Sequence, residues 1–135
     1  MGANELMAGF DMLISSLDSP ESIKQDLLNA FNKKPEEACI YYDSLKLVGL
    51  SKQVSLLVGC YRKYGAVDWL LSIEHDLPRD ERSIASEIAK SIGLNCYLPD
   101  NNSTSYEDFI EYGPENYAGK NVKLSENDND YFKIL

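Results

Sequence analysis

The stretch that most constrains the fold is residues 50–77, LSKQVSLLVGCYRKYGAVDWLLSIEHDL, because it is the most apolar part of the chain. It also contains the only tryptophan, Trp69, and the only histidine, His75. Residues 66–76 are apolar around most of a helical circumference, and a helix of that kind usually lies at the centre of a domain. We therefore expect residues 50–77 to form a central helical hairpin that the rest of the chain covers.

Apolar residues at helical spacing, bounded by Ser, Pro or Gly, predict helices along residues 4–94. Pro suits the first position of a helix, and Gly is typical just past its end. The expected ranges are 4–17, 20–32, 35–48, 51–64, 66–76 and 78–92. Short connections favour antiparallel neighbours. The predicted fold class is mainly α, an irregular antiparallel bundle of about six helices, with a short solenoid of three helical hairpins as the alternative packing.

The character of the chain changes after residue 94. Residues 95–135 contain five of the nine tyrosines and few aliphatic residues. We expect residues 1–94 to form a helical domain and residues 95–135 an acidic, Tyr-rich, irregular segment packed on the same domain. Within that segment, residues 106–112 are expected to form a helical turn or two. Residues 121–124 and 131–135 are expected to pair as a small β-hairpin.

The formal net charge of −9 narrows the choice of partners. Such a surface repels the phosphates of nucleic acids and anionic membranes, and it attracts basic proteins. We therefore expect no direct nucleic-acid binding and no membrane association. The three cysteines, an odd number without CxxC spacing, favour reduced thiols and a cytoplasmic location.

Residue types that carry catalysis or bind metals are sparse. His75 has no second His or paired Cys at ligand spacing, which favours a structural role at the end of a helix. The carboxylates at positions 76, 80 and 81 are typical of the start of a helix. Those at positions 126, 128 and 130 lack the Gly and the final Glu of a calcium-binding loop. The sequence predicts a protein that is not an enzyme, with no catalytic residue, cofactor or metal ligand.

The most informative surface feature is the mixture of tyrosine and carboxylate between residues 105 and 117. Tyrosine offers a large contact area with few rotors to freeze and is enriched at protein interfaces. Carboxylates around it steer a basic partner and accept hydrogen bonds from its Lys and Arg side chains. An exposed polar tail with its tyrosines half-packed on the bundle explains the pattern equally well. The expected partner-binding residues are Tyr106, Glu107, Asp108, Glu111, Tyr112, Glu115 and Tyr117.

In size, acidity, expected helical body and the Tyr–carboxylate segment at 105–117, the chain resembles in type the small acidic immunity proteins that bacteria make against their own secreted or contact-delivered toxins. That class shares no signature motif, so no residue role is carried over. The resemblance implies an acidic inhibitor, or antitoxin, that forms a one-to-one complex with a basic toxin domain, commonly a nuclease, and blocks its active site. The alternatives are a DNA-mimic inhibitor of a host nucleic-acid-binding protein and a helical adaptor or scaffold.

Overall fold

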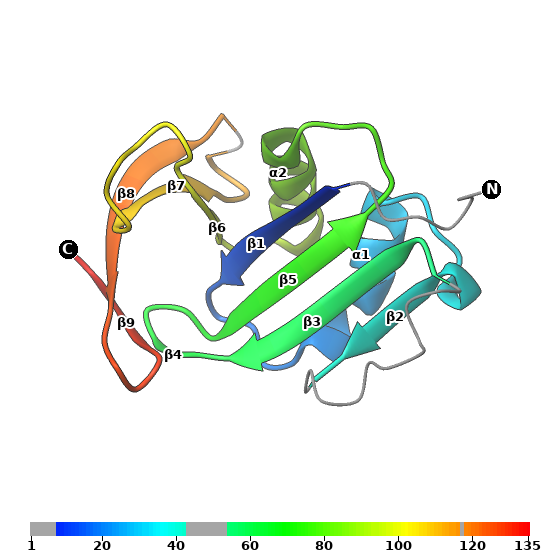
Figure 1. Cartoon of the computed structure of the whole chain (residues 1–135), viewed down its shortest axis with the longest axis horizontal. Helices are drawn as coiled ribbons and strands as arrows, with labels where there is room; N and C mark the ends of the chain where they lie inside the picture. Colours follow the sequence, from blue (N-terminus) through cyan, green and yellow to red (C-terminus); the bar gives the residue numbers. More distant parts are fainter. Residues whose placement is uncertain (1–7, 43–53, 117) are drawn as a thin grey trace.

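The computed structural model describes residues 8–42, 54–116 and 118–135. Within these ranges the chain forms a mixed nine-stranded β-sheet with the strand order β2-β3-β5-β1-β6-β7-β8-β9-β4 (Figure 1). The prediction of a mainly α bundle is therefore wrong. Only two α-helices are present in the described residues, and both are short.

Several strands that are neighbours in the sheet are far apart in the sequence. Their bounds are β1 Ala8–Ile14, β2 Ala38–Tyr41, β3 Leu56–Arg62, β4 Tyr64–Gly65, β5 Trp69–His75, β6 Cys96–Pro99, β7 Asp108–Tyr112, β8 Lys120–Glu126 and β9 Tyr131–Ile134. The helices are α1 Lys24–Ala30 and α2 Glu81–Ile92. The β2–β3 and β4–β9 pairs are parallel, and the other pairs are antiparallel.

The stretch at 50–77 is central, as expected, but as strands rather than as a helical hairpin. β3 pairs antiparallel with β5 along its whole length, and β5 pairs with β1 on its other side. The predicted helices at 51–64 and 66–76 are therefore wrong in their described parts. The β3 sequence is a nearly continuous apolar run, which periodicity alone does not distinguish from a buried helix. In β5, Trp69, Leu71 and Ile73 lie at strand spacing toward the helices and the main core, a pattern the helical interpretation overlooked.

Three other expected helical segments are also strands or turns. Most of the described part of 4–17 is β1, and within 106–112 the residues Asp108–Tyr112 form β7 instead of a helical turn. In 35–48, a single 3₁₀ turn at Pro35–Glu37 leads directly into β2. These segments become strands because they pair with strands that are distant in the sequence. The local spacing of apolar residues does not reveal such pairing. The remaining parts of the predicted ranges, 4–7, 43–48 and 51–53, lie outside the described residues.

Helices are confirmed within the predicted ranges 20–32 and 78–92, because their signals are local. α2 begins at Glu81, three residues after the predicted start at Pro78. Ser19 accepts a hydrogen bond from the Glu21 N–H and starts a 3₁₀ turn at Pro20–Ile23 that continues into α1. α2 buries its apolar stripe and ends at Gly93, whose φ of 71° is the left-handed conformation that suits glycine. The hairpin of β8 and β9 is also confirmed.

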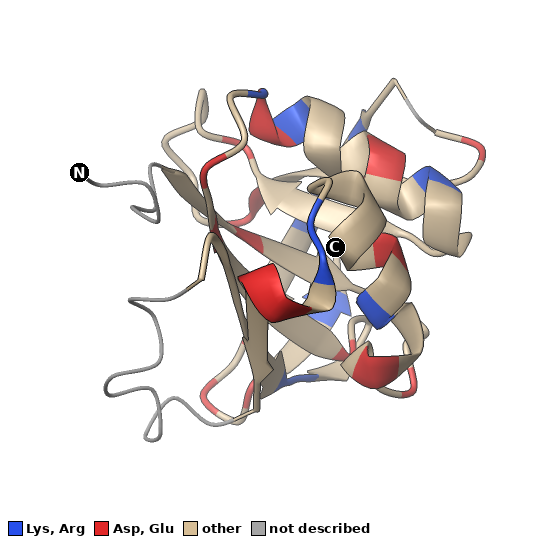
Figure 2. Ribbon diagram, turned by 90° about the vertical axis from the view of Figure 1, so that its right-hand side faces the viewer, with Lys and Arg blue, Asp and Glu red and all other residues tan. Residues whose placement is uncertain are grey.

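Both helices cover one face of the sheet, as the side view in Figure 2 shows. The main core lies between the two helices and the sheet. It includes Phe31 of α1, Ile84 and Ile88 of α2, and Met12 and Ile73 of the central strands, each fully buried. None of the helices in the described part of the chain is long and apolar enough to cross a lipid bilayer.

The sheet curls back on itself at its C-terminal end. β4 follows β3 after one residue and pairs with β9, so the last strand returns to an extension of the third (Figure 1). A second, smaller core of Leu13, Val67, Tyr97, Leu124 and Phe132 fills this curl. Residues 96–134 thus continue the same sheet as residues 8–75.

Candidate partner-binding site

The curl encloses a pocket of about 630 Å³ on the face of the sheet that the helices leave uncovered. Strand alternation turns Met12 and Ile14 toward the helices and Leu13 toward the pocket. We call this feature the concave pocket. Its apolar lining comes from five strands and consists of Leu13, Leu70, Phe109, Leu124 and Phe132. The volume lies within the range of pockets that bind small molecules or short peptide segments.

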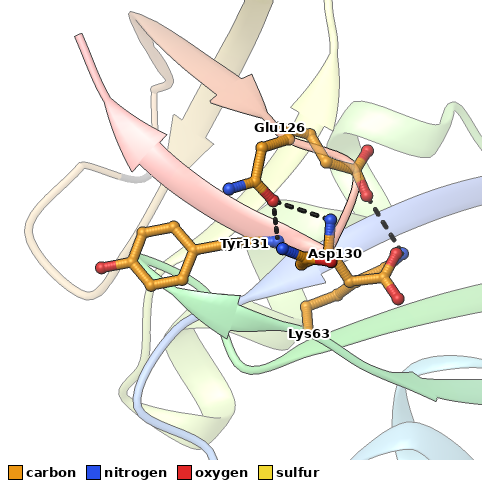
Figure 3. Close-up of polar contacts among 6 residues, drawn as sticks. Lys63, Glu126, Asp130 and Tyr131 are labelled. Carbon is orange, nitrogen blue, oxygen red and sulfur yellow. Dashed lines mark hydrogen bonds and ion pairs between the residues drawn. The ribbon is translucent and has the colours of Figure 1, made fainter.

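Four charged side chains also line the concave pocket, and two of them neutralise each other. Lys63 Nζ lies 3.3 Å from Glu126 Oε2 and 2.9 Å from Asp130 Oδ1 of the β8–β9 turn (Figure 3). Burial alone would lower the pKa of Lys63, but the hydrogen bonds to Asp130 and Glu126 raise it above its ordinary value. Asp11 and Glu107 make no ion pair with any residue that the structure describes. Among the described residues, the pocket therefore presents two carboxylates that lack an ion-pair partner.

An ordered loop holds a fully exposed tyrosine at the edge of the concave pocket. Tyr106 is 99% exposed, although it lies in the loop between β6 and β7 that lines the pocket. Ser103 Oγ accepts a hydrogen bond from the Ser105 N–H, and Ser105 Oγ accepts one from the Glu107 N–H. Asn101 Nδ2 also donates to Glu81 Oε1 of α2 at 2.9 Å. Because the loop is already tied down, presenting Tyr106 to a partner costs little additional ordering.

Asp108, the first residue of β7, follows Glu107 beside this loop. Lys123 of the neighbouring strand β8 and the hydroxyl of Ser103 both donate to its carboxylate. The hydrogen bond from Lys123, followed by that from Ser103, lowers the pKa of Asp108 below its ordinary value. This carboxylate already has two donors, so it helps to hold the loop and is less available to a partner than Glu107 is.

The structure separates the seven residues predicted to bind a partner. Tyr106 and Glu107 lie at the concave pocket. Glu111 is half-buried and accepts a hydrogen bond from Asn116, and Tyr112 is only 4% exposed and belongs to the main core. Glu115 is exposed between β7 and β8, and Tyr117 lies outside the described residues. Successive side chains of β7 point to opposite faces of the sheet, so neighbouring residues in the sequence are separated. In a helical turn, residues three and four apart would have shared one face.

Glu111 also illustrates how the buried polar groups of the curl are satisfied. Tyr97 of β6 is 3% exposed, and its hydroxyl hydrogen-bonds to the Glu111 carboxylate. Burial, together with this carboxylate, raises the pKa of Tyr97 to about 12. The raised pKa favours the neutral tyrosine, whose hydroxyl donates to the carboxyl group of Glu111.

Sequence reasoning missed Asp11, Lys63, Leu70 and Phe109 as pocket residues. They come from β1, the β3–β4 junction, β5 and β7, and only the sheet register brings them together. Asp11 alone interrupts the apolar run FDMLI, and Leu13 on the same strand face is apolar, so no strict alternation marks this strand in the sequence.

His75, for which the sequence predicted a structural role at the end of a helix, lies instead at the end of strand β5. It is 1% exposed, with the rings of Phe10 and Phe31 centred 5.8 and 5.0 Å from its own. Its Nδ1 accepts a hydrogen bond from the Leu77 N–H at 3.0 Å. Burial lowers the pKa of His75, so the neutral imidazole is favoured. In residues 8–42, 54–116 and 118–135, no three His, Cys, Asp or Glu side chains gather in a way that could hold a metal ion.

No protein-family model, curated protein or solved structure matches this chain. Its function is therefore inferred from the chemistry of the concave pocket and its surroundings.

Proposed function

We propose that this chain is an acidic inhibitor protein that binds a basic protein partner at the concave pocket and neutralises it. The observation that carries the proposal is the combination of the exposed Tyr106, the apolar pocket and the unpaired carboxylates of Asp11 and Glu107. An apolar centre with aromatic and charged groups around it is typical of a protein interface. The specific form that we propose is an immunity protein that blocks the active site of a toxin domain in a one-to-one complex.

Tyr106 supplies an anchor for such a complex. At 99% exposure its ring makes almost no contact within the chain, so its whole apolar surface is available to a partner. Burying a large apolar side chain contributes on the order of 2 kcal/mol. Tyrosine is also among the residues that dominate binding energy at interfaces.

The charge of the chain supplies the attraction. A net charge of −9 raises the rate at which a basic partner encounters the surface, and Asp11 and Glu107 place unpaired charge at the pocket itself. Fast capture suits an inhibitor that must act before its target does. A cytoplasmic location is part of this proposal, and the three cysteines form no disulfide.

Neither alternative function gains support. A DNA mimic needs carboxylates spaced like phosphates along one face, whereas in the view of Figure 2 Lys and Arg are interspersed among Asp and Glu. The adaptor alternative relied on a helical bundle, and the sheet replaces that bundle.

The proposal is tested by capturing the partner and measuring how fast it associates. Tagged chain is used as bait in extract of the native host at low and at physiological salt, and bound proteins are identified by mass spectrometry. The association rate constant of the captured protein is then measured for wild type, for an Asp11→Lys/Glu107→Lys double variant, and for a Glu36→Lys/Asp128→Lys control. Glu36 and Asp128 are exposed and lie outside the pocket, and the control changes the net charge by the same amount.

We expect the pocket variant to associate about tenfold more slowly than wild type, and the control to slow by much less. If the partner is a toxin, co-expression of wild-type chain should restore growth that the toxin prevents. Recovery of no basic protein at either salt concentration would refute the proposal. Equal slowing by the two double variants would show that only the overall charge matters and that the interface lies elsewhere.

A further inference from the structure

We propose that the concave pocket receives a short segment of the basic partner that carries an arginine next to an apolar residue. In this arrangement the guanidinium group contacts Asp11 and Glu107, and the apolar neighbour packs on Leu70 and Phe109. The inference rests on the proposed function and specifies the chemistry of the partner at the site.

The volume and the lining of the concave pocket favour a segment over a single side chain. Leu13, Leu124 and Phe132 are 4%, 1% and 5% exposed, so they form the floor of the pocket and offer almost no surface to a ligand. Leu70 and Phe109 are half-buried and still offer apolar surface to a ligand. With a volume of about 630 Å³, the space above this floor is of the size that holds a drug-sized ligand or several side chains.

The two unpaired carboxylates decide the charge of the occupant. A partner that covers the pocket removes water from Asp11 and Glu107, and a desolvated carboxylate without a counter-charge is costly. Lys63 lines the same pocket but is engaged by Glu126 and Asp130. Lys123, whose charge interacts with that of Glu107, is itself engaged by Asp108, so neither lysine supplies a free positive charge. The occupant must therefore supply the cation itself.

Arginine fits this position better than lysine does. Its guanidinium group has five donors in a planar fork, so it can serve carboxylates that come from two different elements, β1 and the β6–β7 loop. The same plane stacks on an aromatic ring, and the exposed ring of Tyr106 stands beside the pocket. A lysine ammonium is a compact charge and gains less from such a ring.

The test uses the full chain, labelled with ¹⁵N, and capped tripeptides as probes. Acetyl-Leu-Arg-Leu-amide is compared with peptides that carry lysine or the neutral isostere citrulline at the central position, and with agmatine as a free cation. We expect the arginine peptide to shift the amide signals of Asp11, Leu70, Glu107 and Phe109. Its Kd should be about tenfold lower than that of the citrulline peptide and lower than that of the lysine peptide.

Variants locate the contact. Asp11→Asn and Glu107→Gln should each weaken the arginine peptide about threefold, and an Asp128→Asn control should leave its Kd unchanged. Wild-type dispersion of the amide spectrum shows that each variant is folded.

Each outcome decides the inference. Absence of shifts at about 10 mM arginine peptide, or equal binding of the citrulline peptide, would overturn it. Equal affinity of agmatine would identify a small cation as the ligand and would also overturn it. In those cases a basic partner captured by the bait would leave the proposed function standing, with a different segment at the pocket.

Discussion

Replacing Gly65 with alanine tests the closure of the sheet around the concave pocket. Gly65 lies in β4 with a φ of 85°, a conformation that residues with a Cβ rarely adopt. An added Cβ would overlap the main-chain carbonyl oxygen of Phe132 in β9 and would touch the ring of Tyr131. That carbonyl accepts a hydrogen bond from the Ala66 N–H at 2.9 Å, so the overlap falls on the pairing that closes the curl.

The expected cost has two parts, and a second glycine separates them. A left-handed conformation costs an alanine about 1 kcal/mol, and forced overlap in a packed site costs about 1–3 kcal/mol. Gly65→Ala should therefore destabilise the fold by about 2–4 kcal/mol. Gly93 has a similar φ of 71° at the end of α2 but has no atom within 4 Å of an added Cβ. Gly93→Ala should therefore cost only about 1 kcal/mol.

Urea unfolding followed by the fluorescence of Trp69, the only tryptophan, gives both free energies. Amide hydrogen exchange adds a local readout, because the Tyr64 N–H and the Ala66 N–H donate to the carbonyls of Asp130 and Phe132. We expect both amides to lose protection in Gly65→Ala and to keep it in Gly93→Ala. Equal destabilisation by the two variants, with unchanged protection of these amides, would refute the closure of the sheet through β4 and β9.

Three further predictions concern stability and reactivity. Lys63→Met removes the cation between the carboxylates of Glu126 and Asp130 and should lower the Tm by about 3–5 °C, corresponding to about 1 kcal/mol. An unchanged Tm would show that these two ion pairs contribute nothing to stability. Because burial lowers the pKa of His75, the unfolded state takes up the proton first. Stability should therefore be complete above about pH 6.5 and fall below it by up to about 1.4 kcal/mol per pH unit, a slope that His75→Phe should reduce. Burial raises the pKa values of Cys60 and Cys96 to about 12. Ellman's reagent should therefore label the half-buried Cys39 at least about a hundredfold faster than it labels Cys60 or Cys96. Similar labelling rates for all three thiols in the native state would contradict this.

The parts of the fold that sequence reasoning predicted are those with local signals. The Ser19-Pro20 start, the four-residue spacing of Ile84 and Ile88, and the terminal Gly93 each act within one or two turns of a helix. The β8–β9 hairpin is also local, since its strands are joined by residues 127–130. These elements were placed correctly.

The central strands could not be recognised in the same way, because their partners lie far along the chain. Ala8 pairs with His75, and Ile14 pairs with both Trp69 and Cys96. A strand buried on both faces, as β3 is, has no polar face to reveal a period of two. Its apolar run fits a helical stripe equally well.

The candidate site was predictable only in part, for the same reason. Tyr106 and Glu107 stand out by composition, because they belong to a polar loop rich in residues typical of turns. Asp11 and Lys63 join them only through the register of the curled sheet. The burial of Tyr112 follows from its position in β7, where Ile110 and Tyr112 alternate with residues of the opposite face.

The most direct test of the proposed binding function is photo-cross-linking in the native host. The chain carries the photoreactive residue p-benzoylphenylalanine at position 106, and a control carries it at position 25, where the exposed Gln25 lies on α1, away from the concave pocket. We predict that position 106 yields one dominant cross-linked species, that it contains a basic protein, and that position 25 yields none. A cross-link to the same protein from position 25 and not from position 106 would contradict the proposed binding site.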